Sequence, residues 1–413
     1  MTGLAKFMLS VQKIRAAIHH KGKSGARQTS GCDLDHHPAQ GPQNAKYPSN
    51  SLRGLPAEIK IKIFACCKIS DFSNLKLACR ALYDLIRLHE HDIARQYLYE
   101  LRHGTLPSPI ATERIYTGNP EDDVILLSDL FPPHKNTKDG YVYTFQYLSS
   151  LRRRQSLCSR LCYYLADRMM DRFIQTEPTL VRSLFPRKKN ERGAYTRKGI
   201  SNIVLYLAPL MYYLLYFLES YKSARSEHRN MVYGEYEFGR LHTPIIQEVR
   251  QSMHHELQTQ ILQSPPFTNT PTLIATHHCM QLLVSYIRYT MSPEEVIDDS
   301  WISSLLTLSP FVRIIEFFSA EIGDGGSQWT QRKDFMNNFS RDIKEHERDK
   351  IKSKIFARAS DQQAHDPLDG VWFDATYAEM SARGAIPHNI EKIYVWDGIP
   401  LNFGCGECRH TRE

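Results

Sequence analysis

The chain lacks the sequence patterns that usually accompany catalysis. It has no glycine-rich phosphate-binding loop, no nucleophile elbow and no pair of carboxylates at a recognisable catalytic spacing. It also has no internal repeat of the leucine-rich, WD or kelch type, because Trp396-Asp397 stands alone and marks no propeller blade. We therefore expect no intrinsic enzymatic activity and no cofactor.

Cysteine is scattered, and neither sign of charge dominates. The nine cysteines form no regular framework, and Cys66 and Cys67 are adjacent, which makes a cross-link between them difficult. This usage is typical of reduced thiols in a cytoplasmic or nuclear protein. The 52 basic and 45 acidic residues leave a net charge of +7, which does not require a nucleic-acid partner. The basic cluster around Arg187-Lys188-Lys189 is most simply a solvated loop.

The first residues contain no acidic side chain before Asp33, and apolar residues recur at helical spacing from Leu4 to Ile18. This basic amphipathic start is typical of a mitochondrial targeting helix; a surface helix and a wrongly assigned start of the chain are open alternatives. No unbroken apolar segment follows the first charges, so we expect no secretory signal. Residues 19–50 hold almost no large apolar side chain and cannot offset chain entropy. We predict that residues 1–50 form a disordered tail.

Residues 52–88 predict a short helical hairpin. Pro56 suits a helix start, because its fixed φ is already helical and its missing N–H would have no partner there. Glu58 falls in the first turn, against the positive end of the helix dipole. A second helix is predicted to begin near Ser70 or Asp71 and to carry one broad apolar stripe to Ile86. Both helices have more apolar surface than one face can bury, which predicts a partner.

The register of both helices resembles an F-box, a helical module that docks on the Skp adaptor of cullin ubiquitin ligases. The resemblance covers residues 51–95 and rests on the run Leu-Pro-x-Glu-Ile-x-x-x-Ile-Phe from Leu55 and on the run Leu-x-Leu-Ala-Cys-Arg from Leu75. The family usually has leucine where this chain has Cys67 and Phe72. The recognition mode that the resemblance implies is helices seated in an apolar groove.

The resemblance also implies which residues face the adaptor. These are Leu55, Pro56, Glu58, Ile59, Ile63, Phe64, Leu75, Leu77, Ala78, Cys79 and Arg80. The alternative interpretation is an ordinary helical hairpin that is buried against the rest of the same chain.

The fold class predicted from the remaining sequence is mostly α, with residues 97–413 forming a larger, mainly helical domain. Amphipathic periodicity and capping signals predict further helices over residues 122–130, 151–173, 244–263, 273–289, from 292 onwards, and 332–359. The last forty residues are rich in aromatic side chains and predict a small closing segment with a short strand. This domain has no family that we identify, although the arrangement resembles F-box proteins common in filamentous fungi.

The most apolar run of the chain, Ile203–Leu218, has sixteen residues, fewer than the roughly 20 that a membrane-spanning helix needs. It contains Pro209 and four tyrosines whose hydroxyl groups need partners. We interpret it as a buried core helix with a kink and expect no membrane partner; a membrane span is the alternative.

The sequence contains two sets of potential metal ligands. Cys405-x-x-Cys408 with His410 resembles half of a zinc site, but no second pair stands at a suitable spacing, so we predict no metal. His277 and His278 are adjacent on a predicted helix, point to different sides and cannot bind a metal jointly as histidines four residues apart can. They are expected to be core or surface histidines.

The sequence thus leads to two functional hypotheses. The first is a substrate-recognition subunit of a Skp–cullin–F-box ubiquitin ligase, which binds the Skp adaptor, and through it cullin, and presents a protein substrate. The second is a non-catalytic helical scaffold that acts outside a ubiquitin ligase, for instance at mitochondria. In the first case the protein places a substrate, and other subunits transfer ubiquitin.

Overall fold

The computed structural model describes residues 55–103, 120–136, 140–176, 183, 185–186, 188–237, 247–291, 299–309, 311–320, 325–352, 369–385, 392–396 and 399–402. Helices make up 85% of these residues, in 13 segments, which confirms the mostly α class. The predicted tail over residues 1–50, the helix start at Ser292 and the Cys405-x-x-Cys408 pair lie outside the described residues.

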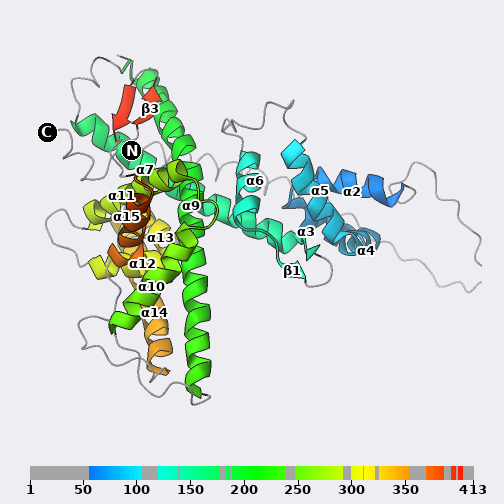
Figure 1. Cartoon of the computed structure of the whole chain (residues 1–413). Helices are drawn as coiled ribbons and strands as arrows, with labels where there is room; N and C mark the ends of the chain where they lie inside the picture. Colours follow the sequence, from blue (N-terminus) through cyan, green and yellow to red (C-terminus); the bar gives the residue numbers. More distant parts are fainter. Residues whose placement is uncertain are drawn as a thin grey trace, which may run out of the picture.

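The first helices are short and closely spaced: α2 spans Ala57–Ala65, α3 Asp71–Ala78, α4 Arg80–Leu88 and α5 Glu90–His103. Pro56 precedes α2 with an extended ψ of 154°, and its carbonyl oxygen accepts the hydrogen bond from the Lys60 N–H at 3.2 Å. The predicted helix start is therefore confirmed, with proline just before the first helical residue. In Figure 1, α2 to α5 project from one side of the larger helical body.

The predicted second helix is wrong in one respect, because it is two helices. Cys79 adopts an extended conformation, with φ −162° and ψ 157°, and separates α3 from α4. In one straight helix Phe72 and Ile86 would lie about 21 Å apart along the axis, at about 1.5 Å per residue. The break instead lets both side chains enter the same small core.

A connection follows in which α6, Pro120–Leu130, leads to a small antiparallel hairpin of β1, Lys135–Asn136, and β2, Gly140–Tyr141. Gly140 has a φ of +82°, which a residue with a Cβ rarely adopts. The helix predicted over residues 122–130 is confirmed. The long helix α7, Phe145–Thr176, begins beside the first helices and continues into the body.

The body is assembled around α7 and α9, Lys189–Glu237, which has 49 residues and contains Pro209. The other helices of the body are α10, Gln247–Leu262, α11, Thr270–Met291, α12, Asp299–Leu308, α13, Val312–Ala320, and α14, Gly325–Lys352. Of the charged segment predicted as a long helix over residues 332–359, α14 covers the part up to residue 352 and buries Phe335 and Phe339.

The C-terminal part contains the 3₁₀ turn η2, Asp369–Val371, helix α15, Phe373–Ala382, and an antiparallel pair of β3, Lys392–Trp396, and β4, Ile399–Asn402. The prediction of a short strand in this aromatic segment is confirmed. Trp372, between η2 and α15, is fully buried, and its ring meets that of Phe217 edge-on at 4.5 Å. β3 lies against α9 (Figure 1).

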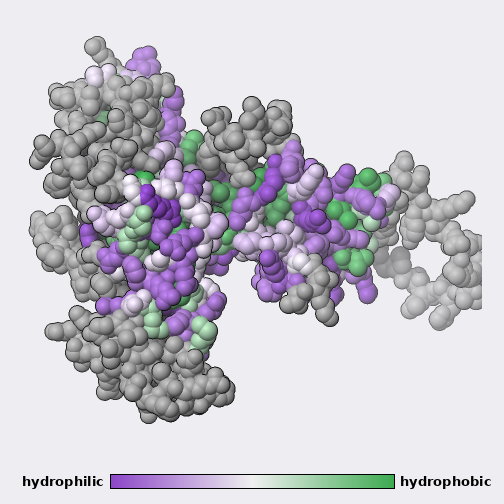
Figure 2. All heavy atoms as spheres, in the orientation of Figure 1, coloured by the Kyte–Doolittle hydropathy of each residue, from purple (hydrophilic) through white to green (hydrophobic). Residues whose placement is uncertain are grey.

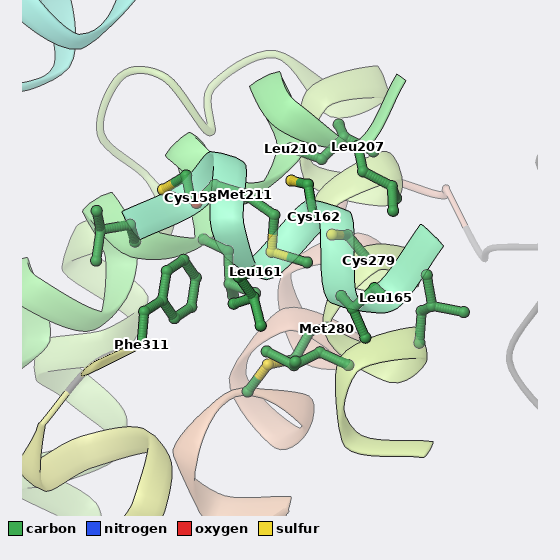
Figure 3. Packing of buried hydrophobic residues seen from close by; sticks show 14 of the residues in the cluster. Cys158, Leu161, Cys162, Leu165, Leu207, Leu210, Met211, Cys279, Met280 and Phe311 are labelled. Atoms are coloured by element: carbon green, nitrogen blue, oxygen red, sulfur yellow. Dashed lines mark hydrogen bonds between the residues drawn. The ribbon is translucent and has the colours of Figure 1, made fainter. Parts of the chain in front are cut away.

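The centre of the body is apolar and includes three thiols, Cys158 and Cys162 on α7 and Cys279 on α11 (Figure 3). Burial raises the pKa of the Cys158 and Cys162 thiols well above the usual value. Within the described residues, one helical stretch, Glu191–His228, is long and apolar enough to cross a membrane. More than half of its most apolar window, 56%, is buried inside the protein, which agrees with the core-helix interpretation of Ile203–Leu218.

Candidate functional site

The first helices have a small core of their own. Its buried side chains come from α2 to α5 and from the first turn of α7: Phe64, Ala65, Phe72, Ile86, Ile93, Ala94, Tyr97, Phe145 and Leu148. Phe72 stacks on Phe145 with ring centroids 4.3 Å apart. We call α2, α3 and α4 with this core the N-terminal module. The predicted domain boundary after residue 95 falls inside α5, and the core of the module reaches beyond it to Tyr97 and α7.

Most of the residues predicted to face the adaptor lie on the outside of the module. The exposed ones are Pro56, Glu58, Ile59, Ile63, Leu77, Ala78, Cys79 and Arg80, and Leu55 and Leu75 are half-buried. Exposure reaches 84% for Leu77, 43% for Ile59 and 41% for Ile63. Ile59 and Ile63 are four residues apart and therefore share one face of α2. In Figure 2, hydrophobic residues gather on the surface of the projecting part of the molecule.

Phe64 differs from the rest of the predicted set. It is 3% exposed and belongs to the module's own core, so its side chain does not reach the surface. The physical reason is helical geometry: Phe64 follows Ile63 by about 100° around α2, and α5 packs against that side. Its role in this structure is to hold α2 in place, and we correct its assignment accordingly.

Two exposed apolar side chains on α4 were absent from the predicted set. Leu88 is 78% exposed and Tyr83 is 42% exposed. The sequence signal for Leu88 is its position off the apolar stripe of its helix, which is the same signal that marks Leu77. For Tyr83 the stripe gives no equivalent signal.

Polar contacts join the module to α7. The N–H of Phe145 donates to Oε1 of Glu90 at 2.7 Å, so a side chain of α5 satisfies an otherwise unpaired amide at the start of α7. Lys76 lies 3.9 Å from the same carboxylate, and its ammonium group lies 4.8 Å from the centre of the Phe145 ring. These contacts fix α3, α5 and α7 to one another.

A chain of hydrogen bonds continues from the module into the body. Nη2 of Arg152 donates to the Tyr97 hydroxyl at 2.8 Å, and Nη1 donates to Gln155 at 3.3 Å. Gln155 in turn contacts the Asp123 carboxylate at 3.5 Å, and the Tyr212 hydroxyl donates to that carboxylate at 2.7 Å. These five residues come from α5, α6, α7 and α9, so the orientation of the module is coupled to the core of the body.

The two adjacent histidines of α11 are both buried, at 2% exposure for His277 and 1% for His278. Burial, helped by the neighbouring His278, lowers the pKa of His277 to about 4, and burial also lowers the pKa of His278. This agrees with the core alternative of the prediction. Among the residues that the structure describes, no group of three or more His, Cys, Asp or Glu side chains is arranged to hold a metal ion.

Comparison with protein-family models, with curated proteins and with solved structures gave no match for this chain.

Proposed function

We propose that the protein is the substrate-recognition subunit of a Skp–cullin–F-box ubiquitin ligase and that its N-terminal module docks on the Skp adaptor. The main support for the proposal is that α2 to α4 have two apolar faces, one that is buried in the core of the module and one that is exposed. These helices already fill a core with Phe64, Phe72 and Ile86, and they still expose Ile59, Ile63, Leu77 and Leu88. The positions that the F-box resemblance assigns to the adaptor are, with the exceptions given above, the accessible ones.

The energetics favour a partner for this surface. Full burial of an isoleucine or leucine side chain is worth about 1.5–3 kcal/mol relative to exposure. Ile59 and Ile63 are already more than half buried and can gain only part of this free energy, whereas Leu77 and Leu88, at 84% and 78% exposure, can gain most of it on association. A few side chains usually carry most of the affinity of an interface, and amphipathic helices that dock in an apolar groove use anchors at helical spacing.

The test is co-expression of the full chain with a Skp adaptor, followed by co-purification and light scattering. We expect a 1:1 complex with the wild-type chain and its loss in the double variant Ile63→Glu, Leu77→Glu. The matched control is Leu205→Glu on α9, because Leu205 is 40% exposed, almost the same as Ile63. Circular dichroism should show the same helix content and melting for all three chains.

A wild-type chain that ignores the adaptor, or a double variant that still binds it, would contradict the proposal. The scaffold alternative is separated by adding the cullin subunit to the purified pair. A ternary complex supports the ligase, whereas an adaptor complex that excludes cullin supports a scaffold outside the ligase.

A further inference from the structure

A groove in the body, far along the chain from the module, has the features of a binding site. It has a volume of about 470 Å³ and lies between α11 and α15, which are neighbours in Figure 1. Pockets for specific ligands typically measure about 300–1,000 Å³. One wall is formed by α11 residues at helical spacing, including His277, Gln281 and Val284, and the other by α15 residues, including Phe373 and Tyr377.

The hydrogen bonds of Thr376 fix the tautomer of His277. The Thr376 hydroxyl has one hydrogen and lies 2.8 Å from the carbonyl oxygen of Trp372, four residues earlier, to which it donates. The oxygen of the same hydroxyl lies 3.2 Å from Nδ1 of His277 and accepts a hydrogen bond from it. Nδ1 therefore carries the proton, and Nε2 of this neutral imidazole is an acceptor.

This acceptor is weakly occupied. Among the described residues, Nε2 contacts the side-chain amide of Gln281, one turn away on α11, at 3.4 Å, which is long for a hydrogen bond. Both residues line the groove. Because the pKa of His277 is lowered to about 4, the ring stays neutral and Nε2 remains an acceptor throughout the physiological pH range.

The groove around this acceptor is partly apolar. The Phe373 ring stands nearly perpendicular to the imidazole, at 86° and with centroids 5.7 Å apart, and Val284 is 3% exposed. Tyr377, which is 48% exposed, and Asp374 lie in the wall towards solvent. A complementary group has an apolar body that packs between the walls and a polar tip that donates a hydrogen bond. A carboxylate or phosphate does not fit at Nε2, because it would place acceptor against acceptor.

We propose that this groove binds a peptide segment by taking up a tyrosine or tryptophan side chain whose O–H or N–H donates to Nε2 of His277. Both side chains combine an aromatic body with a donor at the tip. The inference rests on the proposed function in one respect, namely that the peptide belongs to the protein that the ligase recruits. Peptide binding itself requires neither the adaptor nor cullin.

The experiment uses the purified full chain, labelled with a fluorophore, on an array of random heptapeptides whose central residue is fixed. We expect central tyrosine and tryptophan to bind about tenfold more strongly than central phenylalanine, since phenylalanine brings no donor and leaves Nε2 with the long contact to the Gln281 amide. Central phosphotyrosine should lose binding. Equal signals for tyrosine and phenylalanine, no enrichment of aromatic residues, or preferential binding of phosphotyrosine near Arg288 would each overturn the proposal.

Two variants locate the binding. Ala378→Trp fills the groove from an exposed position of α15, and Ala382→Trp makes the same change at an exposed position of the same helix outside the lining. We expect Ala378→Trp to abolish the preference and Ala382→Trp to keep it; binding that survives Ala378→Trp would place it elsewhere and contradict the proposal. Adaptor binding is measured on the same preparations, so a failure of the groove is distinguished from a failure of the module.

Discussion

The cysteines that the structure describes fall into two groups, one in each region of the molecule. In the N-terminal module Cys66 and Cys79 are exposed and Cys67 is half-buried, whereas Cys158, Cys162 and Cys279 of the body are all buried. Large apolar side chains show a weaker contrast: the module exposes leucine or isoleucine on each of its three short helices, whereas the much larger described part of the body exposes Leu205, Met231, Met336 and Tyr377. The module has a core of a few residues, and the body has a core that extends across α7, α9 and α11.

The contrast is between a small module with an exposed apolar face and a larger body with an enclosed apolar core. A short helix cannot bury both of its apolar faces against a neighbour of similar size, so the module leaves one face exposed, which is the face that the proposed function assigns to the adaptor. The body encloses a larger apolar core, and polar side chains line the groove between α11 and α15. α7 contributes side chains to both cores and thereby sets the direction in which the module points.

The largest expected effect comes from the body. Trp372→Ala should lower the free energy of unfolding by about 3–5 kcal/mol, as removal of a buried aromatic side chain does. Trp372 is fully buried and packs on Phe217 and Phe267. Denaturant titration measures the change, and Tyr377→Ala, at an exposed aromatic position of α15, should stay within about 0.5 kcal/mol.

The same variant sharpens the comparison between the regions. If the two cores are separate, Trp372→Ala should still bind a Skp adaptor at low temperature, where the body remains folded. Loss of adaptor binding without loss of helix content would show that the body controls the module more tightly than the contacts of α7 suggest.

A smaller effect is expected in the module. Phe72→Ala removes the ring that stacks on Phe145 at 4.3 Å and should cost about 3 kcal/mol of local stability. Because the core of the module is small, limited proteolysis should then cut within residues 57–88, and adaptor binding should fall with it. Leu77→Ala, at 84% exposure, is the matched control, and its proteolysis should equal that of the wild type.

Sequence periodicity predicted the helical class and several helices, including the core helix around Ile203–Leu218, because apolar spacing reports which face of a helix is buried. It did not predict the break at Cys79, since the run from Asp71 to Leu88 contains neither glycine nor proline and its stripe is continuous. The break results from packing, which brings Phe72 and Ile86 together. The periodicity of apolar residues within one helix does not report contacts between residues in different helices.

The exposed face of the module and the groove between α11 and α15 also differ in how far the sequence predicts them. The outward face of the module was predictable, because Ile59, Ile63 and Leu77 follow from helical register and from a resemblance spread over a continuous segment. The groove was not, because its walls are separated by about a hundred residues of sequence and only the fold brings α11 and α15 together. The sequence predicted only that His277 is a core or a surface histidine. Its contact with Thr376, which defines the tautomer, could not be predicted, because the two residues are far apart in the sequence and meet only in the folded chain.

An acid-sensitive link between α13 and α14 should give an effect of about 1.5–3 kcal/mol, typical of a hydrogen bond to a charged group. Nε of Arg313 donates to Asp342 at 2.7 Å, and the Ser309 hydroxyl donates to the same carboxylate at 2.8 Å. Burial alone would raise the pKa of Asp342, but these hydrogen bonds outweigh it and hold the pKa below its ordinary value.

Because the folded pKa of Asp342 is depressed, its contribution is complete above the unfolded pKa of about 4 and is lost as the pH falls through the folded value. Asp342→Asn should therefore lower stability at pH 7, and its difference from the wild type should shrink as the pH falls below the unfolded pKa of about 4. Denaturant titrations from pH 7 to pH 3 measure this, with Asp334→Asn, an exposed position of the same helix, as the control. A constant difference across that range would contradict the assignment.

The smallest perturbation is alkylation of the native chain. It tests, without any substitution, the contrast between the exposed cysteines of the module and the buried cysteines of the body. Iodoacetamide reacts with thiolates that solvent reaches, so Cys66 and Cys79 should be labelled within minutes. Cys158 and Cys162 should resist until the protein unfolds, because burial both hides them and raises their pKa. Mass spectrometry after digestion reads each site. If the module docks as proposed, adding a Skp adaptor should protect Cys79 and leave the body unchanged, whereas labelling of Cys79 at an undiminished rate would mean that α3 and α4 face away from the adaptor.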